Sequence, residues 1–383
     1  MKKLNNSGII HHLLLIIVAA SVIAAVGFTG WRIFLSNEQS ANAESACQSW
    51  SGTTSLADTI NKYSCVEIQP GTYEISKPIP VFGKKIVKGV SGKRDQTVLK
   101  AVAPWQTTIG DGILNVFTAD GFLNIDSITL DANNIATYSL VSMNMNVDNV
   151  RLRNGTCSAL GITGKNVTVK NSIIEKSGYK CGITGGVPVG AGIYGEVNKS
   201  ANGTYDRFLN PVIENNLIER NFGPGVDING VWGGTFKNNI VRYNSDWAGV
   251  SIYGGSYWNI SYNQISHPAT KSYQIYHKYC AGGPYGKKSA ALILCQDTGK
   301  DGLLTNYNTV IGNKLSSNYG ILVIGADELV KWYAPRLNTF KDNDIFGSYY
   351  PCADDLKLKQ WYSDTNTWTN NKCGTYNGQP IRF

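Results

Sequence analysis

The chain has 383 residues, a formal net charge of +8 and eight cysteines, and 42% of its residues are hydrophobic. None of the cysteines lies in a CxxC pair, which argues against a zinc site or a redox-active dithiol. No basic stripe has the spacing of a nucleic-acid-binding motif, so we predict no nucleic-acid partner.

A mostly apolar run follows two lysines at the start of the chain. The 23 residues from Leu13 to Leu35 are enough to cross a bilayer core of about 30 Å. A secretory signal peptide would have a shorter apolar core with a cleavage site close behind it, and this cleaved form is the alternative. We predict a cytoplasmic N-terminus and a single-pass transmembrane anchor at residues 1–35, with the rest of the chain extracellular. Residues 36–54 are predicted to be a polar tether.

A short unit recurs between residues 149 and 343. Each copy has an asparagine flanked at two residues' distance by apolar residues, then a glycine-containing turn and a second short strand. Such short units cannot hold a helix pair, and a period of 20 to 50 residues is typical of a solenoid. Two of the distances between consecutive asparagines are about twice the length of one unit. Each of these segments contains only one recognisable strand-turn-strand pattern, so we predict single coils with inserted loops. The asparagines in this register, expected to form a ladder inside a turn, are Asn149, Asn171, Asn215, Asn238, Asn263, Asn313 and Asn343.

The stretch from Val66 to Tyr73, VEIQPGTY, leads into an apolar strand, a glycine turn and a short strand that ends at Leu99. This pattern resembles the opening coils of the pectate-lyase-like right-handed β-helix superfamily, and the resemblance continues to about Gly347. It implies an all-β fold, a right-handed parallel β-helix solenoid that follows the transmembrane helix. Residues 56–63 are expected to form a short helix that caps the open end of the solenoid. We predict one domain, β-helix and cap together, over residues 55–347.

Residues 348–383 have little periodicity, and we predict a disulfide-closed C-terminal cap there. An even number of cysteines in an exported chain favours disulfides, although spacing does not fix their connectivity. Cys157 lies 8 residues after Asn149, and Cys181 lies 10 after Asn171, so these two cysteines should stack in neighbouring coils. The predicted pairs, in chain order, are Cys47 with Cys65, Cys157 with Cys181, Cys280 with Cys295, and Cys352 with Cys373.

Two long inserts, residues 177–189 and 266–289, interrupt the repeat at the same place, after the asparagine-containing strand and before the next one. Between them lie two uninterrupted coils. Inserts that stack on one face would form the walls of a trough two coils wide. A solenoid makes a concave site in this way, from loops held on a rigid scaffold.

The alternation of strand side chains predicts the floor of this trough. Val226 and Ile228 should point into the core, which leaves Asp227 and Asn229 outward. We take Asp227 and Asp246 as candidate catalytic residues. Strand geometry puts them about 8 to 14 Å apart, and the lower end suits an acid and a base with a water between them. Alternatively, both carboxylates satisfy backbone amides in turns.

Outward-facing aromatic rings around the trough would stack on sugar faces, although the same rings also pack coil on coil. Removal of a proton next to a uronate carboxylate needs a base and a cation, which histidine, arginine and lysine side chains would supply. A single loop histidine is, however, more often a solvated surface residue. The predicted substrate-binding residues are Tyr194, Glu196, Arg220, Asn229, Arg242, Trp247, Ser251, Tyr253, Lys271 and His277.

The sequence departs from the enzymes of the resembled superfamily. It has neither the calcium-binding carboxylate cluster and arginine motif of pectate lyases nor the NTD, DD and GHG motifs of polygalacturonases. The stretch GPGVDING is loosely similar to the floor strand of polygalacturonases and alginate epimerases, which relates Asp227 to their aspartate. Asp227, Asn229 and Asp246 offer oxygen ligands for calcium, but a calcium site usually has denser carboxylates. We predict no metal and no cofactor.

Residues 1–43 contain three basic and one acidic side chain, so residues 44–383 keep 32 basic and 26 acidic ones, a net charge of +6. This excess suits an acidic glycan. We predict a membrane-anchored extracellular protein that binds an acidic polysaccharide, with lyase, hydrolase or C5-epimerase activity as an open question. The alternative is a non-catalytic adhesin or structural spike. The oligomeric state is not predicted.

Overall fold

The chain divides into two units, Met1–Cys47 and Gln48–Phe383. The predicted anchor at residues 1–35 and most of the predicted tether lie outside the described residues. In the described part of the chain, no helix is long and apolar enough to cross a membrane. The computed structural model describes residues 47–105, 111–116, 121–181, 190–197, 207, 209–245, 248–268, 289–295, 305–317, 319–324, 335–348, 350–354, 365–373 and 381–382.

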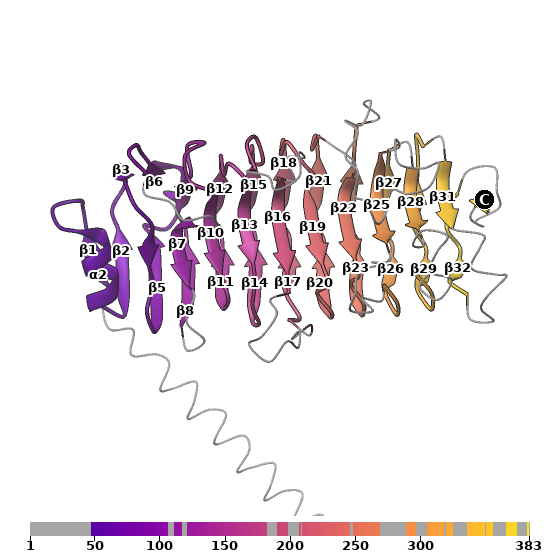
Figure 1. Ribbon diagram of the computed structural model, residues 1–383, viewed down its shortest axis with the longest axis horizontal. Helices are drawn as coiled ribbons and strands as arrows, with labels where there is room; N and C mark the ends of the chain where they lie inside the picture. Colours follow the sequence, from indigo (N-terminus) through magenta and orange to yellow (C-terminus); the bar gives the residue numbers. More distant parts are fainter. Residues whose placement is uncertain are drawn as a thin grey trace, which may run out of the picture. The chain divides into compact units, whose positions relative to one another are not determined.

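The second unit is a β-helix built from three parallel sheets (Figure 1). Most coils add one strand to each sheet, so a strand pairs with the strand about three further along the chain. Sheet A contains β1 (Gln48–Trp50), β2 (Cys65–Ile68), β5 (Lys84–Gly89), β8 (Phe122–Asp126), β11 (Met145–Asp148), β14 (Val167–Lys170), β17 (Val212–Glu214), β20 (Gly234–Lys237), β23 (Trp258–Ser261), β26 (Thr309–Ile311), β29 (Thr339–Lys341) and β32 (Thr367–Thr369). Sheet B contains β3 (Gly71–Ile75), β6 (Thr97–Ala101), β9 (Thr129–Asp131), β12 (Arg151–Arg153), β15 (Ile173–Glu175), β18 (Leu217–Glu219), β21 (Ile240–Arg242), β24 (Gln264–Ser266), β27 (Lys314–Ser316) and β30 (Asp344–Ile345). Sheet C contains β4 (Ile79–Pro80), β7 (Gly112–Val116), β10 (Tyr138–Ser142), β13 (Ser158–Ile162), β16 (Ala191–Glu196), β19 (Val226–Asn229), β22 (Ala248–Tyr253), β25 (Ala290–Cys295), β28 (Tyr319–Ile324), β31 (Tyr350–Asp354) and β33 (Ile381–Arg382).

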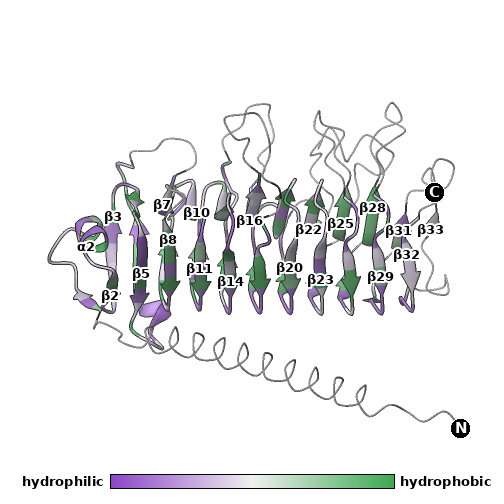
Figure 2. Ribbon diagram, turned by 90° about the horizontal axis from the view of Figure 1, so that it is seen from below, coloured by the Kyte–Doolittle hydropathy of each residue, from purple (hydrophilic) through white to green (hydrophobic). Residues whose placement is uncertain are grey.

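Alternating side chains give each strand of sheet A a core face and a solvent face. In β11, Met145 and Val147 are buried, whereas Asn146 and Asp148 are exposed. In Figure 2, hydrophobic colour runs along most of the labelled strands of sheet A, whereas β5 and the turns are largely hydrophilic. The apolar side chains therefore form one core that runs along the inside of the coils.

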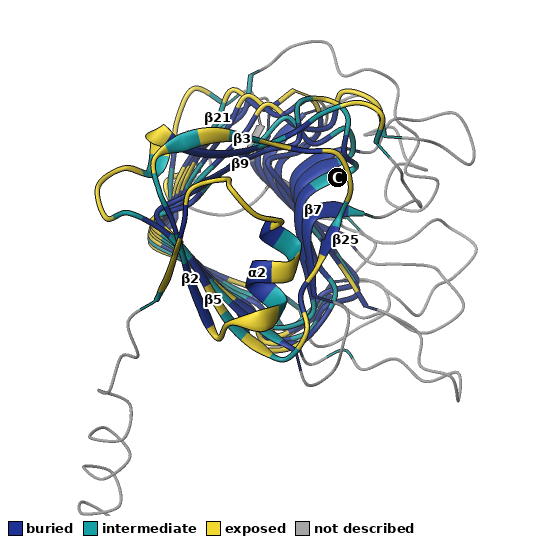
Figure 3. Ribbon diagram, turned by 90° about the vertical axis from the view of Figure 1, so that its left-hand side faces the viewer, coloured by how far each residue is buried: buried dark blue, intermediate teal, exposed yellow. Residues whose placement is uncertain are grey.

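The helix α2 (Leu56–Lys62) forms where the sequence predicts it. The Ser55 side chain accepts a hydrogen bond from the Asp58 amide and caps the helix N-terminus, which satisfies one of the free amides there. Leu56 and Ile60 are buried on its inner face. Figure 3 shows α2 across the end of the coil, where it covers the first core residues.

The coils begin earlier and end later than the repeat pattern indicates. β1 lies inside the predicted tether and pairs with β2, and Trp50 packs against Tyr73 at a ring distance of 4.6 Å. Within the predicted C-terminal cap, β31, β32 and β33 continue sheets A and C. A short 3₁₀ turn, η1 (Arg94–Gln96), precedes β6.

The two long inserts occur within single coils, as predicted. β14 pairs directly with β17, and β23 pairs directly with β26, so no extra turn lies between them. Both inserts join a strand of sheet B to the following strand of sheet C.

For the first four predicted positions, the side chain that enters the ladder position belongs to the next residue in the sequence, not to the predicted asparagine. Asn149, Asn171, Asn215 and Asn238 have left-handed backbone angles, with φ between 49° and 59°, a conformation that asparagine tolerates better than most residues. In the Asn-Asn pairs at 215–216 and 238–239, the second residue points inward. The prediction is therefore wrong for these four and correct for Asn263, Asn313 and Asn343. The observed ladder consists of Asn216, Asn239, Asn263, Asn313, Asn343 and Asn371.

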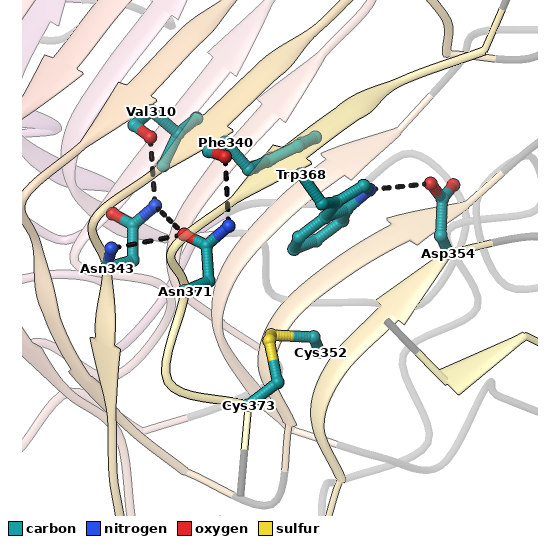
Figure 4. The surroundings of a disulfide bond; sticks show 8 residues. All are labelled: Val310, Phe340, Asn343, Cys352, Asp354, Trp368, Asn371 and Cys373. Carbon is teal, nitrogen blue, oxygen red and sulfur yellow. Dashed lines mark hydrogen bonds between the residues drawn. A yellow bond between two sulfur atoms is a disulfide. The ribbon is translucent and has the colours of Figure 1, made fainter. Parts of the chain in front are cut away.

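Each step of this ladder satisfies backbone and side chain together. Asn263 Nδ2 donates to Phe236 O at 2.8 Å and to Asn313 Oδ1 at 2.9 Å, while its own Oδ1 accepts from the Asn239 amide. Figure 4 shows the last step, from Asn343 to Asn371. Shorter ladders occupy the other two corners, between Asn221 and Asn244 and along Asn308, Asn338 and Asn366.

Two predicted disulfides are confirmed: Cys157 with Cys181 and Cys352 with Cys373, the latter next to the Trp368 ring in Figure 4. Cys47, Cys65 and Cys295 are also disulfide-bonded. Cys280 lies outside the described residues, and the pairings predicted for these four cysteines stay predictions.

Candidate functional site

Sheet C differs from sheet A because most of its residues are buried on both of its faces. Every residue of β22 and of β25 is buried, and Figure 3 shows β7 and β25 dark blue. Outward-facing Ile293 and Leu322 belong to a second apolar cluster outside the main core. In the last coils, the outward face of sheet C is therefore apolar.

In the middle coils, the same outward face is polar. Tyr194 of β16 lies in register with Asp227 of β19, which lies in register with Ser251 of β22. A second row joins Glu196, Asn229 and Tyr253 in the same way. Neighbouring strands are about 4.8 Å apart, so the structure brings six of the predicted site residues together.

Burial increases across this group. Glu196 is exposed, Tyr194 and Asn229 are half-buried, and Asp227 and Ser251 are fully buried at 0% exposure. Among the described residues, Asn229 Oδ1 and Ser251 Oγ have no hydrogen-bond partner. Both are shielded polar atoms directly beside a buried carboxylate, and such atoms in folded proteins nearly always have a partner.

Tyr194 and Glu196 form a hydrogen bond in which the Tyr194 hydroxyl donates to Glu196 Oε2 at 2.7 Å. Burial raises the pKa of Tyr194 far above its ordinary value, and the negative charges of Glu196 and Asp227 raise it further. The phenol therefore keeps its proton and acts as a donor that holds Glu196 in place.

Tyr138 of β10 is a site residue that the sequence did not single out. Burial raises its pKa, and the charge of Glu196 raises it further. Its ring lies against Gly161, where an added Cβ would come within 3.3 Å of the ring. Gly161 of β13 pairs in register with Tyr194 of β16. Because glycine has no side chain, this position leaves room for the Tyr138 ring. Neither a motif nor the register marks this residue in the sequence, because Tyr138 pairs with Ser158 and it is Val141 that pairs with Gly161.

Arg220 and Arg242 lie elsewhere. Arg242 Nε is 2.7 Å from Glu219 Oε2, and Arg220 Nη1 is 3.6 Å from Glu219 Oε1. The hydrogen bond to Glu219 raises the pKa of Arg242. Glu219 and Arg242 end the sheet B strands β18 and β21 and pair in register there. Two of the predicted cations therefore bind a carboxylate on another sheet.

The described part of the site thus contains two carboxylates, those of Glu196 and Asp227, and two protonated tyrosines.

Asp246, Trp247, Lys271 and His277 lie outside the described residues, so the predicted acid and base pair stays a prediction. His267 is buried, and its amide donates to Ser316 O at the end of sheet B. Within the described ranges, no group of three or more His, Cys, Asp or Glu side chains is arranged to hold a metal ion.

Residues 190–372 match the family described as "Right handed beta helix region". With the three parallel sheets, this match decides the architecture. The chain is a right-handed parallel β-helix repeat protein. No curated protein matches it significantly.

Solved structures of several kinds are similar to this β-helix protein. The A-module of mannuronan C-5 epimerase AlgE4 from Azotobacter vinelandii is 15% identical, with a TM-score of 0.48 over 83% of this chain and 96% of that one. The surface adhesin PfbA of Streptococcus pneumoniae is 14% identical, with a TM-score of 0.48 over 83% of this chain and 73% of that one. The catalytic domain of a GH87 alpha-1,3-glucanase is 12% identical, with a TM-score of 0.45 over 85% of this chain and 68% of that one. We draw nothing about function from these similarities.

Proposed function

We propose that this chain binds an extracellular polysaccharide on the outward face of sheet C, across β16, β19 and β22. The observation that carries the proposal is the pair of buried polar atoms, Asn229 Oδ1 and Ser251 Oγ, without a partner among the described residues. Sugar hydroxyl groups both donate and accept, so a glycan satisfies such atoms. The exposed Glu196 and half-buried Tyr194 mark the side from which it enters.

We assign Asp227 to any chemistry on the bound glycan, cleavage or epimerisation, because it is the buried carboxylate in the middle of the polar row. A positioned carboxylate acts as general acid or base when it lies within hydrogen-bond reach of the proton that it transfers. The disulfides support an extracellular location, because they persist in oxidising compartments.

The test is to incubate the purified full-length chain, with its disulfides intact, with neutral and acidic glycans. Binding, new reducing ends, the ultraviolet absorbance of unsaturated products and epimer composition are followed together. We expect binding by the wild type and by Asp148→Asn, which changes an exposed carboxylate on sheet A. Asp227→Asn should lose any product formation while it stays folded. If no glycan binds, the proposal is wrong.

One observation favours the non-catalytic alternative, an adhesin. Arg220 and Arg242, the two predicted cations that the structure describes, pair with Glu219 on sheet B, whereas proton abstraction from a uronate needs a cation beside the base. Binding without new ends or altered epimers, in the same experiment, would support the adhesin and leave the binding surface unchanged.

A further inference from the structure

The corner between sheets B and C exposes aromatic rings in the coils that contain β15, β18 and β21. Tyr179 and Phe222 meet edge to face, with their ring centroids 5.2 Å apart, and the two side chains are 55% and 51% exposed. Tyr243, in the next coil, is 60% exposed. Apolar side chains that gather on a surface mark interaction sites, whereas single ones are ordinary. An edge-to-face pair leaves ring faces uncovered, and these are flat surfaces for a ligand.

Cationic side chains lie in the same corner. Lys176 and Arg220 are exposed and occupy equivalent positions, directly after β15 and β18, with φ of 55° and 57°. These strands pair in register up to their last residues, so the two backbones are about 4.8 Å apart. Lys180 Nζ lies 5.8 Å from the centroid of the Tyr179 ring. Three cations therefore accompany the aromatic pair.

The carboxylates of this corner are shielded and already paired. Among the described residues they are Glu175 and Glu219, which are 6% and 5% exposed. Glu175 Oε1 lies 3.5 Å from Arg151 Nε, and Glu219 is shared by Arg220 and Arg242. The Arg220 side chain stays 56% exposed. One buried carboxylate between two guanidinium groups leaves an excess of positive charge toward solvent.

Two bonds fix the segment that carries Tyr179 and Lys180. Cys181 forms a disulfide with Cys157 of the preceding coil, and the Lys180 amide donates to Thr156 O at 2.8 Å. A surface that is already ordered loses less conformational entropy when it binds a ligand. The corner therefore presents its rings and cations in a fixed arrangement.

We propose that this corner is a second glycan-binding site, separate from the outward face of sheet C, and that its ligand is an acidic polysaccharide. The site, which we call the corner patch, consists of Lys176, Tyr179, Lys180, Arg220, Phe222 and Tyr243. Sugar rings stack on aromatic faces, while carboxylates on the same sugars pair with the guanidinium and ammonium groups. An acidic polypeptide would use the cations and leave the rings without stacked partners, so the patch favours a glycan. This inference goes beyond the proposed function and stands without it.

The experiment separates charge from sugar rings by measuring binding of the full-length chain, with its disulfides intact, to four polymers. Alginate and polygalacturonate have both sugar rings and carboxylates, dextran has only the rings, and poly-glutamate has only the carboxylates. We expect the two acidic glycans to bind at least about tenfold more tightly than the other polymers. Their affinity should fall as salt is added, because salt screens exposed charges.

Two variants locate this binding in the corner patch. Arg220→Gln should weaken acidic-glycan binding about tenfold, as expected for a lost hydrogen bond between charged groups. Phe222→Ala should weaken it about fivefold through the lost ring face and leave poly-glutamate binding unchanged. The matched controls are Lys341→Gln, a 49% exposed cation at the end of β29 on sheet A, and Phe346→Ala, which is 51% exposed like Phe222. Both should bind like the wild type.

The outcomes distinguish the two binding sites. Acidic-glycan binding that neither Arg220→Gln nor Phe222→Ala weakens would overturn the corner patch, and its loss in Asn229→Ala alone would leave the sheet C site standing. Poly-glutamate binding as tight as alginate binding, and insensitive to Phe222→Ala, would overturn the glycan class. Tight dextran binding that Arg220→Gln does not weaken would overturn the acidic class. Failure of all four polymers to bind would overturn this inference, whatever sheet C binds.

Discussion

Two regions of this protein bury polar side chains, and they treat them in opposite ways. In the corner ladders, the side chains from Asn216 to Asn343 donate to a carbonyl and to the next asparagine. On the outward face of sheet C, Asn229 Oδ1 and Ser251 Oγ are equally shielded but have no partner among the described residues. An unsatisfied buried group costs free energy that a satisfied one does not. The ladders therefore stabilise the coils, whereas the sheet C group leaves two shielded polar atoms unsatisfied among the described residues, which is the basis of the proposed glycan site.

The largest effect should come from breaking a ladder. Asn263→Ala removes the acceptor of the Asn239 amide and the donor to Phe236 O, leaving both groups buried. We expect a loss of about 3 kcal/mol in the free energy of unfolding, measured by chemical denaturation. Asn259→Ala is the control, because Asn259 is exposed on β23, and it should change stability by about 0.5 kcal/mol or less. Equal losses in the two variants would contradict the structural role of the ladder.

Two buried serines give the sharpest version of the comparison. Ser172 Oγ accepts from the Val150 amide and donates to Lys170 O, whereas Ser251 Oγ has no partner among the described residues. Ser172→Ala should therefore cost about 1 to 2 kcal/mol of unfolding free energy, and Ser251→Ala about 0.5 kcal/mol or less. Glycan binding should respond in the reverse order. A costly Ser251→Ala would show that this hydroxyl is structural.

Alkaline pH should destabilise the site through Tyr194. Burial and the charges of Glu196 and Asp227 raise its pKa in the folded state, so above a pH of about 10 the unfolded chain loses this proton first. Its contribution is fully present below that pH and falls by at most about 1.4 kcal/mol per pH unit above it. Thermal unfolding should show a shallower alkaline decline in Tyr194→Phe. Tyr243→Phe, which changes an exposed ring, should follow the wild-type curve.

The smallest effect concerns Asp95, a half-exposed carboxylate that pairs with Arg94 and Arg151 at the surface, whereas Asp227 is fully buried. Burial tends to raise its pKa, but the hydrogen bond with Arg94 and the charge of Arg151 together hold it below the ordinary value. The contribution of Asp95 to the free energy of unfolding is therefore fully present above the pKa of about 3.9 that it has in the unfolded chain. It is lost as the pH falls through the lower pKa of the folded state. We expect Asp95→Asn to remove about 0.2 to 1 kcal/mol at neutral pH and to flatten the acid limb. A larger loss would mean that this exposed network matters more than its exposure suggests.

Much of the candidate site was predictable because strand alternation is local. Outward positions at Tyr194, Glu196, Asp227, Asn229, Ser251 and Tyr253 follow from a period of two, and stacked coils bring them into register. The pairing of Arg220 and Arg242 with Glu219 was not predictable in this way. It depends on the direction in which each long arginine side chain extends from its strand. The closeness of two arginines to an aspartate in sequence does not determine that direction.

The sequence by itself determined the β-helix, its single coils with inserts, and two of its disulfides, because each rests on short repeats that recur at matching positions. Only the tertiary structure decided which asparagine of an Asn-Asn pair turns inward, since both fit the pattern and the choice depends on how the whole coil closes. It also decided that the Tyr138 ring lies against Gly161 of the neighbouring coil. Such contacts join coils far apart in sequence, where no local period links the residues.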